Sequence, residues 1–280
     1  MIDYLIFAVL YGLLLLGIHR KIIARIQRRP GPPIWQEILH TAKFSFKSTW
    51  VPRTASATLF VSIVMVAIGI WVAAFFLVLA GESVLLLFGI YMLHKIVEHG
   101  FGLSSGSPYG KFGGVRSVIS AASEIPLFVT IAAVFYFTRS LMISDLVTFQ
   151  AAEGPLLLLV PPAAIAMYLV ILSKMPFGPF SIVESKELVS GYKTEHFGVW
   201  RAGLEICNGL KTYVLLYAFV LIFIGQLPFV GMLAVMLGIL VSLSFVCALC
   251  PMLSPFDSVT VQSLITGIML GYIAVLGVLM

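Results

Sequence analysis

The sequence predicts an all-α polytopic membrane protein with about eight transmembrane helices and one amphipathic helix at the membrane interface. Hydrophobic residues make up 60% of the chain and charged residues only 10%, and the mean hydropathy is +1.08. These values lie outside the range of soluble globular proteins. Several apolar runs reach the ~20 residues needed to cross a ~30 Å hydrocarbon core. A transmembrane β-barrel would need alternating strands, which the sequence does not contain.

The first predicted helix covers residues 3–20. No basic residues precede this apolar run, no small-residue cleavage site follows it, and it ends in a basic cluster. This pattern is typical of a retained transmembrane helix and not of a signal peptide.

The connector 21–56 is predicted to carry the amphipathic helix. It is broken by the Pro/Gly run at 30–33, after which apolar residues alternate with polar ones at near-helical spacing. A helix with this pattern lies in the membrane interface, and we expect Lys43 and Lys47 to face water.

The remaining seven helices follow from the other apolar runs, and together the chain forms one membrane domain over 1–280. A Gly/Ser-rich connector, 100–114, and a polar connector, 175–198, separate some of them. Two adjacent prolines are expected to kink the fifth span. The predicted ranges are 57–80, 84–99, 115–138, 156–174, 199–225, 228–249 and 258–279.

Basic residues predict the topology. With eight spans, both termini lie on one side, and the connectors 21–56, 100–114 and 175–198 lie on the other. These connectors and the helix ends beside them hold all of the 17 Lys and Arg residues except Arg139. The positive-inside rule then places both termini outside and the three connectors in the cytoplasm of a multi-pass protein of the cell membrane.

Three glutamates fall within or at the ends of predicted spans. Glu124 and Glu205 lie about two turns inside their helices, and Glu98 lies at the cytoplasmic end of its helix. Carboxylates are costly in a membrane and mark functional sites. Because the three share a similar depth, they could surround one polar cavity and exchange protons through water, since a desolvated Glu titrates closer to neutral pH. The alternative is a structural role in ion pairs with nearby basic residues: Lys95, Arg116 or Lys211.

The longest polar interruption of the chain is Lys174–Lys211. It holds four of the twelve acidic residues, Glu184, Glu187, Glu195 and Glu205. Glu184 and Glu187 are three residues apart and would share one face of a helix. These acids are either solvated loop charges or a charged strip that faces a redox partner and responds to it.

Two further patterns have simple readings. The basic run Arg20–Arg29 serves as a topology signal and contacts anionic lipids, or it docks a partner. Cys247 and Cys250 form a C-x-x-C inside an apolar run, where packing between helices is favoured over metal ligation. The net charge of +5 reflects topology and does not indicate nucleic acid. The sequence contains no nucleotide-binding loop, zinc spacing or nucleophile triad.

Three motifs carry a family resemblance that covers nearly the whole chain. They are R-K-I-I-A-R-I-Q-R-R-P-G-P-P at 20–33, S-E-I-P-L at 123–127, and P-F at 176–177 followed by E-L-V-S-G-Y-K-T-E at 187–195. In this order the chain resembles the subunit 1 (H-type) family of respiratory complex I. It is most similar to the counterpart in membrane-bound, energy-converting [NiFe] hydrogenases.

The chain also departs from this family pattern. His40 stands where the family commonly has Asp, Gly178 replaces the Asp after Pro-Phe, and Phe197 replaces the Tyr after Glu195. Glu124, Glu187 and Glu195 match motif positions of the family, whereas Glu184 lies where the pattern fails.

The resemblance implies a non-catalytic membrane subunit of an oxidoreductase complex, which links electron transfer from ferredoxin to protons with proton or sodium translocation. It implies a [NiFe] hydrogenase-like large subunit, an iron–sulfur small subunit and antiporter-like membrane subunits as partners, besides lipids. The iron–sulfur clusters and the NiFe centre would belong to those partners, with no cofactor in this chain. The ion relay would use Glu98, Glu124, Glu184, Glu187, Glu195 and Glu205. Partner docking or pKa tuning would use Arg25, Arg28, Arg29, Arg116 and Lys211.

Three alternatives remain at this point. The chain could be the quinone-site subunit of a complex I-type dehydrogenase, in which helix 3–20 and the amphipathic helix frame the quinone access. It could be a stand-alone ion transporter, but that class predicts inverted repeats, and the sequence has no convincing internal symmetry. A purely structural membrane anchor would not need three intramembrane carboxylates.

Overall fold

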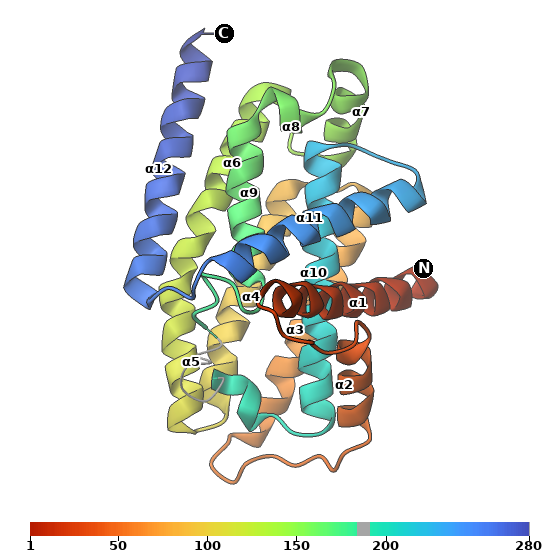
Figure 1. Ribbon diagram of the computed structural model, residues 1–280, viewed down its shortest axis with the longest axis vertical. Coiled ribbons are helices and arrows are strands. Elements are labelled where there is room, and N and C mark those ends of the chain that lie inside the picture. The colour runs from red at the N-terminus through yellow and green to blue at the C-terminus, as the bar shows by residue number, and fades with distance from the viewer. Residues whose placement is uncertain (184–190, 280) are drawn as a thin grey trace.

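The computed structural model describes residues 1–183 and 191–279, and this part of the chain confirms the predicted all-α fold. It contains twelve α-helices and two short 3-10 helices, η1 and η2 (Figure 1). Their bounds are α1 Ile2–Ile26, α2 Gln36–Ser45, α3 Ala57–Ala80, α4 Val84–Ser104, α5 Pro108–Ile119, η1 Ser120–Glu124, α6 Ile125–Thr138, α7 Ile143–Glu153, α8 Leu156–Leu159, α9 Pro161–Lys174, η2 Gly191–Glu195, α10 Val199–Phe223, α11 Phe229–Leu249 and α12 Pro255–Leu279.

Six of these helices are long and apolar enough to cross a membrane: α1, α3, α4, α10, α11 and α12. They correspond to six of the eight predicted spans. The other two predicted spans, 115–138 and 156–174, contain shorter apolar helices, α6 and α9, of 14 residues each. Each of these two spans is divided. The sequence predicted only a kink, at the two adjacent prolines of the second of these spans.

Proline explains both divisions. Pro126 lies in the first turn of α6, and Pro161 begins α9. A proline lacks the N–H of a helical hydrogen bond and disfavours the helical conformation of the residue before it, so it begins a helix more readily than it continues one. Val160 accordingly leaves the helical region, with φ −133° and ψ 65°.

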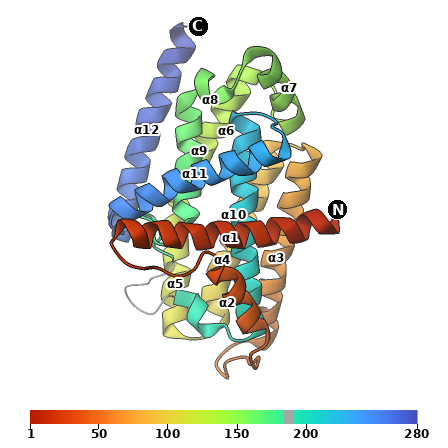
Figure 2. The same ribbon diagram turned by 45° about the vertical axis from the view of Figure 1, so that its right-hand side comes forward.

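Helix α10 is the centre of the bundle, and 83% of its apolar stretch is buried. Helix α1 crosses α10 instead of running alongside it (Figures 1 and 2). The crossing depends on Gly12 and Gly209, because a Cβ on Gly12 would overlap the Gly209 carbonyl oxygen. Small residues at such a crossing let two membrane helices approach to backbone contact. Helix α12 stands at the edge of the molecule and packs against α6 and α9.

Helix α2 lies against α10 beneath α1 (Figure 2). Its buried residues are Glu37 and Thr41, while Leu39 is exposed, as is Trp35 just before the helix. The helix is therefore amphipathic, with a polar face turned into the protein and an apolar face turned outward. Lys43 is exposed as well.

The predicted connector 100–114 is mostly helical, because α4 continues to Ser104 and α5 begins at Pro108. Its glycines, which suggested a loop, are packing positions. A Cβ on Gly102 would overlap the backbone of Gly110 and Gly114, so these glycines allow α4 and α5 to pack closely. Helix α7 lies between the predicted spans 115–138 and 156–174.

Candidate functional site

Four charged side chains form a cluster inside the bundle. Lys95 and Glu98 come from α4, Glu124 ends η1, and Lys174 ends α9. Lys95 Nζ lies 2.9 Å from Glu98 Oε2 and 3.7 Å from Glu124 Oε1. Lys174 Nζ lies 3.4 Å from Glu124 Oε1 and 3.9 Å from Glu98 Oε2. Each lysine thus lies within ion-pair distance of both acids, and we refer to these four residues as the Glu/Lys cluster.

The cluster is almost completely buried, since none of its four side chains is more than 7% exposed. Isolated charges in a membrane interior are costly, and two acids with two bases compensate one another. Because each charge has two opposite partners, a proton can be gained, lost or moved within the cluster while other ion pairs persist. This property suits a site that responds to an external electric field.

Local structure brings the cluster together. Lys95 and Glu98 are three residues apart on α4 and therefore share one face of that helix. Glu124 lies at the break before α6, and Lys174 is the last residue of α9. Lys95 Nζ also donates to the hydroxyl of Ser120 in η1. The break before α6 and the C-terminal end of α9 thus supply two of the four charges.

A cavity of about 390 Å³ lies beside the cluster. Glu98 and Lys174 form part of its wall, and Glu205 of α10 lines it as well. Glu98 and Glu205 therefore share one cavity, while Glu124 contacts it through Lys174. Other charged residues of the wall are Arg20, Glu37, Lys193, Arg201 and Lys211.

Ion pairs hold the cavity wall. Arg20 of α1 pairs with Glu37 of α2, which joins these two helices. On α10, Arg201 Nη2 lies 2.9 Å from Glu205 Oε1. Glu37 and Glu205 are both nearly buried, with side chains 8% exposed, so these pairs compensate charges that face the cavity rather than bulk water.

The 3-10 helix η2 is anchored beside the cavity by His196. This residue is buried, its Nδ1–H donates to the Tyr192 carbonyl oxygen at 2.8 Å, and its ring stacks on Phe60 at 4.3 Å between centroids. Burial and the positive charge of Arg201 together lower the pKa of His196 to about 4, although the hydrogen bond to the Tyr192 carbonyl acts in the opposite direction. His196 is therefore neutral at physiological pH.

The predicted acids of the polar stretch have different outcomes. Glu195 lies half-buried at the end of η2. Glu184 and Glu187 lie outside the described residues. The predicted relay roles of Glu184 and Glu187 therefore stay predictions.

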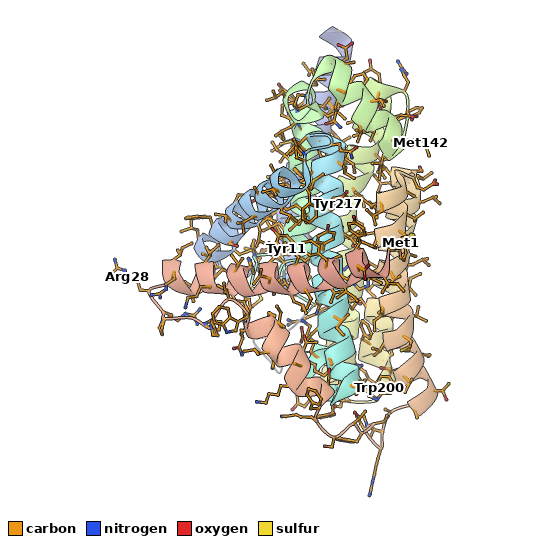
Figure 3. The ribbon with its side chains drawn as sticks, turned by 90° about the vertical axis from the view of Figure 1, so that its right-hand side faces the viewer. Met1, Tyr11, Arg28, Met142, Trp200 and Tyr217 are labelled. Atoms are coloured by element: carbon orange, nitrogen blue, oxygen red, sulfur yellow. The ribbon has the colours of Figure 1, made fainter. Side chains whose placement is uncertain are left out.

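The predicted basic residues do not gather at one place. Arg25, Arg28 and Arg29 are exposed at the end of α1, and Figure 3 shows Arg28 at its outer tip, away from the bundle. Arg116 is half-buried on α5. Lys211 instead lies buried in the cavity wall, where its Nζ donates to Asn208 Oδ1 at 3.1 Å.

The structure adds residues to the predicted site. Lys174, the last residue of α9, is buried between two acids. The pair Arg20–Glu37 was missed because its members are separated by the Pro/Gly break. An i, i+4 spacing links Arg201 to Glu205, and that spacing was available in the sequence. His40, noted only as a family departure, lines the cavity.

No metal-ligand group is found in the described part of the chain, where no three His, Cys, Asp or Glu side chains come together. The two residues of the C-x-x-C differ in environment. Cys247 is buried and Cys250 is exposed.

Comparisons with known proteins agree with this architecture. The profile of a family described as NADH dehydrogenase matches residues 1–279. A protein of Methanocaldococcus jannaschii, described as a candidate NADH-ubiquinone oxidoreductase, is 49% identical over 273 residues, covering 96% of this chain and 92% of the relative. A chain in the structure of the membrane-bound sulfane sulfur reductase, an archaeal respiratory membrane complex, superposes with a TM-score of 0.84 at 25% identity and 97% coverage of both chains.

Proposed function

Since the chain belongs to the NADH dehydrogenase family, as a complex I subunit 1 (H-type) member, and is a membrane subunit of a complex I-like respiratory oxidoreductase complex, we propose that it couples electron transfer to ion movement. Its complex would be of the membrane-bound [NiFe] hydrogenase type, passing electrons from ferredoxin to protons. The subunit would anchor the electron-transfer module and move protons or sodium ions in response to it.

The observation that carries this proposal is the Glu/Lys cluster beside a charged cavity. A membrane anchor has no need of four buried charges. A neutral cluster with interchangeable ion pairs is instead a two-state element that an external charge can bias.

In this mechanism, a redox change in a partner subunit alters the field at the cavity. The field changes the proton affinity of Glu98 and Glu205 in the wall, and Lys174 passes the change to Glu124. Glu124 then exchanges protons on the far side of the cluster, toward neighbouring membrane subunits. Glu184, Glu187 and Glu195 would form the part of the relay nearest the partner.

The partners in this proposal are a [NiFe] hydrogenase-like large subunit, an iron–sulfur small subunit and antiporter-like membrane subunits. Iron–sulfur clusters and the NiFe centre would be held by those partners. The exposed arginines at the end of α1 would dock the partner or bind anionic lipids, on the cytoplasmic side, with both termini outside.

Two alternatives come from the relatives. The likeness to the sulfane sulfur reductase subunit favours a partner that reduces sulfur compounds. The relative described as a candidate NADH-ubiquinone oxidoreductase favours a quinone-dependent complex, with the cavity between α1, α2 and α10 as the quinone site.

Purification of the intact complex from native membranes in mild detergent tests these proposals. If nickel-containing and iron–sulfur subunits co-purify with this chain, and the complex evolves hydrogen with reduced ferredoxin, the hydrogenase type is supported. Reduction of polysulfide or of a quinone, without hydrogen evolution, would favour one of the alternatives. Isolation of this chain alone would contradict the proposal and indicate a transporter.

A further inference from the structure

His94 and Trp71 form a buried pair that the proposed mechanism does not use. His94 lies on α4 one helical turn before Glu98. His94 is 3% exposed and Trp71 is 0% exposed. The indole N–H of Trp71 on α3 donates to His94 Nδ1 at 3.1 Å. An indole nitrogen can only donate, so His94 Nδ1 must accept and carry no hydrogen. In the neutral ring the hydrogen is therefore on Nε2.

The Nε2–H group of His94 has no hydrogen-bond partner among the residues that the structure describes. A buried, unpaired donor costs ~1–3 kcal/mol, and membrane surroundings provide no solvent to reduce this cost. The charged groups that act on the His94 ring are Lys211 of α10, Glu98 and Lys95 of α4, and Lys174 of α9. Lysines cannot accept a hydrogen bond, so Glu98 is the one group of these four that could accept from Nε2–H, either directly or through a water.

The cavity comes within one helical turn of His94. Glu98, four residues after His94 on α4, lines the 390 Å³ cavity together with Lys174 and Lys211, whereas His94 is not part of the cavity wall. Polar surroundings of this kind hold internal water, which typically makes two to four hydrogen bonds to otherwise unpaired groups.

We propose that His94 is a positioning residue whose Nε2–H holds an internal water beside Glu98, one helical turn further along α4. The inference rests on the proposed ion-coupling function and extends the Glu/Lys cluster by one helical turn along α4. Trp71 keeps His94 in one tautomer, because protonation of Nδ1 would place two N–H groups against each other. The water oxygen then faces His94, and its hydrogens are directed toward the Glu98 carboxylate.

Two substitutions of His94 in the intact complex distinguish the role of Nε2 from that of Nδ1. In His94→Gln the side-chain amide can donate from near the Nε2 position, while in His94→Asn the amide oxygen can accept from Trp71 near the Nδ1 position. We expect His94→Gln to keep at least half of the ions moved per electron, and His94→Asn to lose about 10-fold. Equal losses, or wild-type transport in both variants, would overturn the proposal.

A second measurement does not depend on transport. Solid-state NMR of the complex with ¹⁵N-labelled histidine, assigned by the signal lost in His94→Gln, should find the Nε2–H tautomer in contact with water. Trp71→Phe should give mixed tautomers and a new acidic limb in the pH profile of transport. A single unchanged tautomer in Trp71→Phe, or a dry His94 in the wild type, contradicts the inference. A wild-type complex that moves no ions would instead sink the proposed function, and the NMR result would still decide on the water site.

Discussion

Neutralising Glu124 is the perturbation that the structure describes most completely. Glu124 is 2% exposed and lies within ion-pair distance of both Lys95 and Lys174. Glu124→Gln leaves two buried lysines with Glu98 as their one acid in the cluster. Breaking a buried ion pair by removing one partner costs ~3–5 kcal/mol. We expect that loss of stability for the complex, together with loss of redox-linked ion movement.

A compensating substitution separates stability from function. Glu124→Gln combined with Lys174→Met restores the charge balance of the cluster, because Lys95 and Glu98 remain paired at 2.9 Å. We expect the double variant to regain stability to within ~1 kcal/mol of the wild type, since neutral replacement of a buried pair is often tolerated. Ion movement should stay absent, because Lys174 and Glu124 are both needed for the relay.

Both variants are measured in the intact complex, with thermal denaturation for stability and reconstituted vesicles for ion movement. Glu153→Gln is the matched control, since Glu153 is exposed on α7 and its neutralisation should change stability by less than ~0.5 kcal/mol. Ion movement that recovers in the double variant along with stability would refute the relay role and leave the cluster a purely structural one.

Three further predictions concern other parts of the fold. Gly12→Ala should destabilise the complex by ~2 kcal/mol or more because its Cβ meets backbone, whereas Gly69→Ala, with open space around it, should be neutral or stabilising in thermal denaturation. Burial lowers the pKa of His196 from 6.5 to about 4. The contribution of His196 to the free energy of unfolding is therefore complete above pH 6.5, and about 3 kcal/mol of it is lost as the pH falls toward 4. His196→Asn should flatten that loss when thermal stability is measured against pH. Arg28→Glu should weaken co-purification of the partner subunits, whereas Arg139→Glu, at a similarly left-handed and exposed position (φ 56° against 58°), should not.

Length and hydropathy were enough to predict the helical class and six of the spans, because each of these helices is a continuous apolar run. The two divided spans were harder to predict from sequence. Apolar residues continue through Pro126 and through Pro161, so hydropathy reports one long segment where the backbone makes two. The glycines of 100–114 predict a loop by composition, but in the structure Gly102, Gly110 and Gly114 are contact points between α4 and α5.

The position of the buried acids along their helices could be predicted in part from the sequence. Glu98 and Glu205 were expected at similar depth, and they line the same cavity. The role of Lys174 was hidden, because a lysine at a helix end usually extends to water. Its partners come from segments 50 and 76 residues away in sequence, and only the packing of α4, η1 and α9 brings them together. Pairings of this kind have no local signal in a single sequence.

The central claim is that a redox change in a partner subunit alters the protonation of the Glu/Lys cluster. Redox-induced infrared difference spectroscopy of the intact complex measures this directly, because a carboxyl group that gains or loses a proton gives a C=O band that shifts in D₂O. We predict such a band on reduction of the partner's electron carriers, and its disappearance in Glu124→Gln. A band that is unchanged in Glu124→Gln, or no carboxyl signal in the wild type, would contradict the claim.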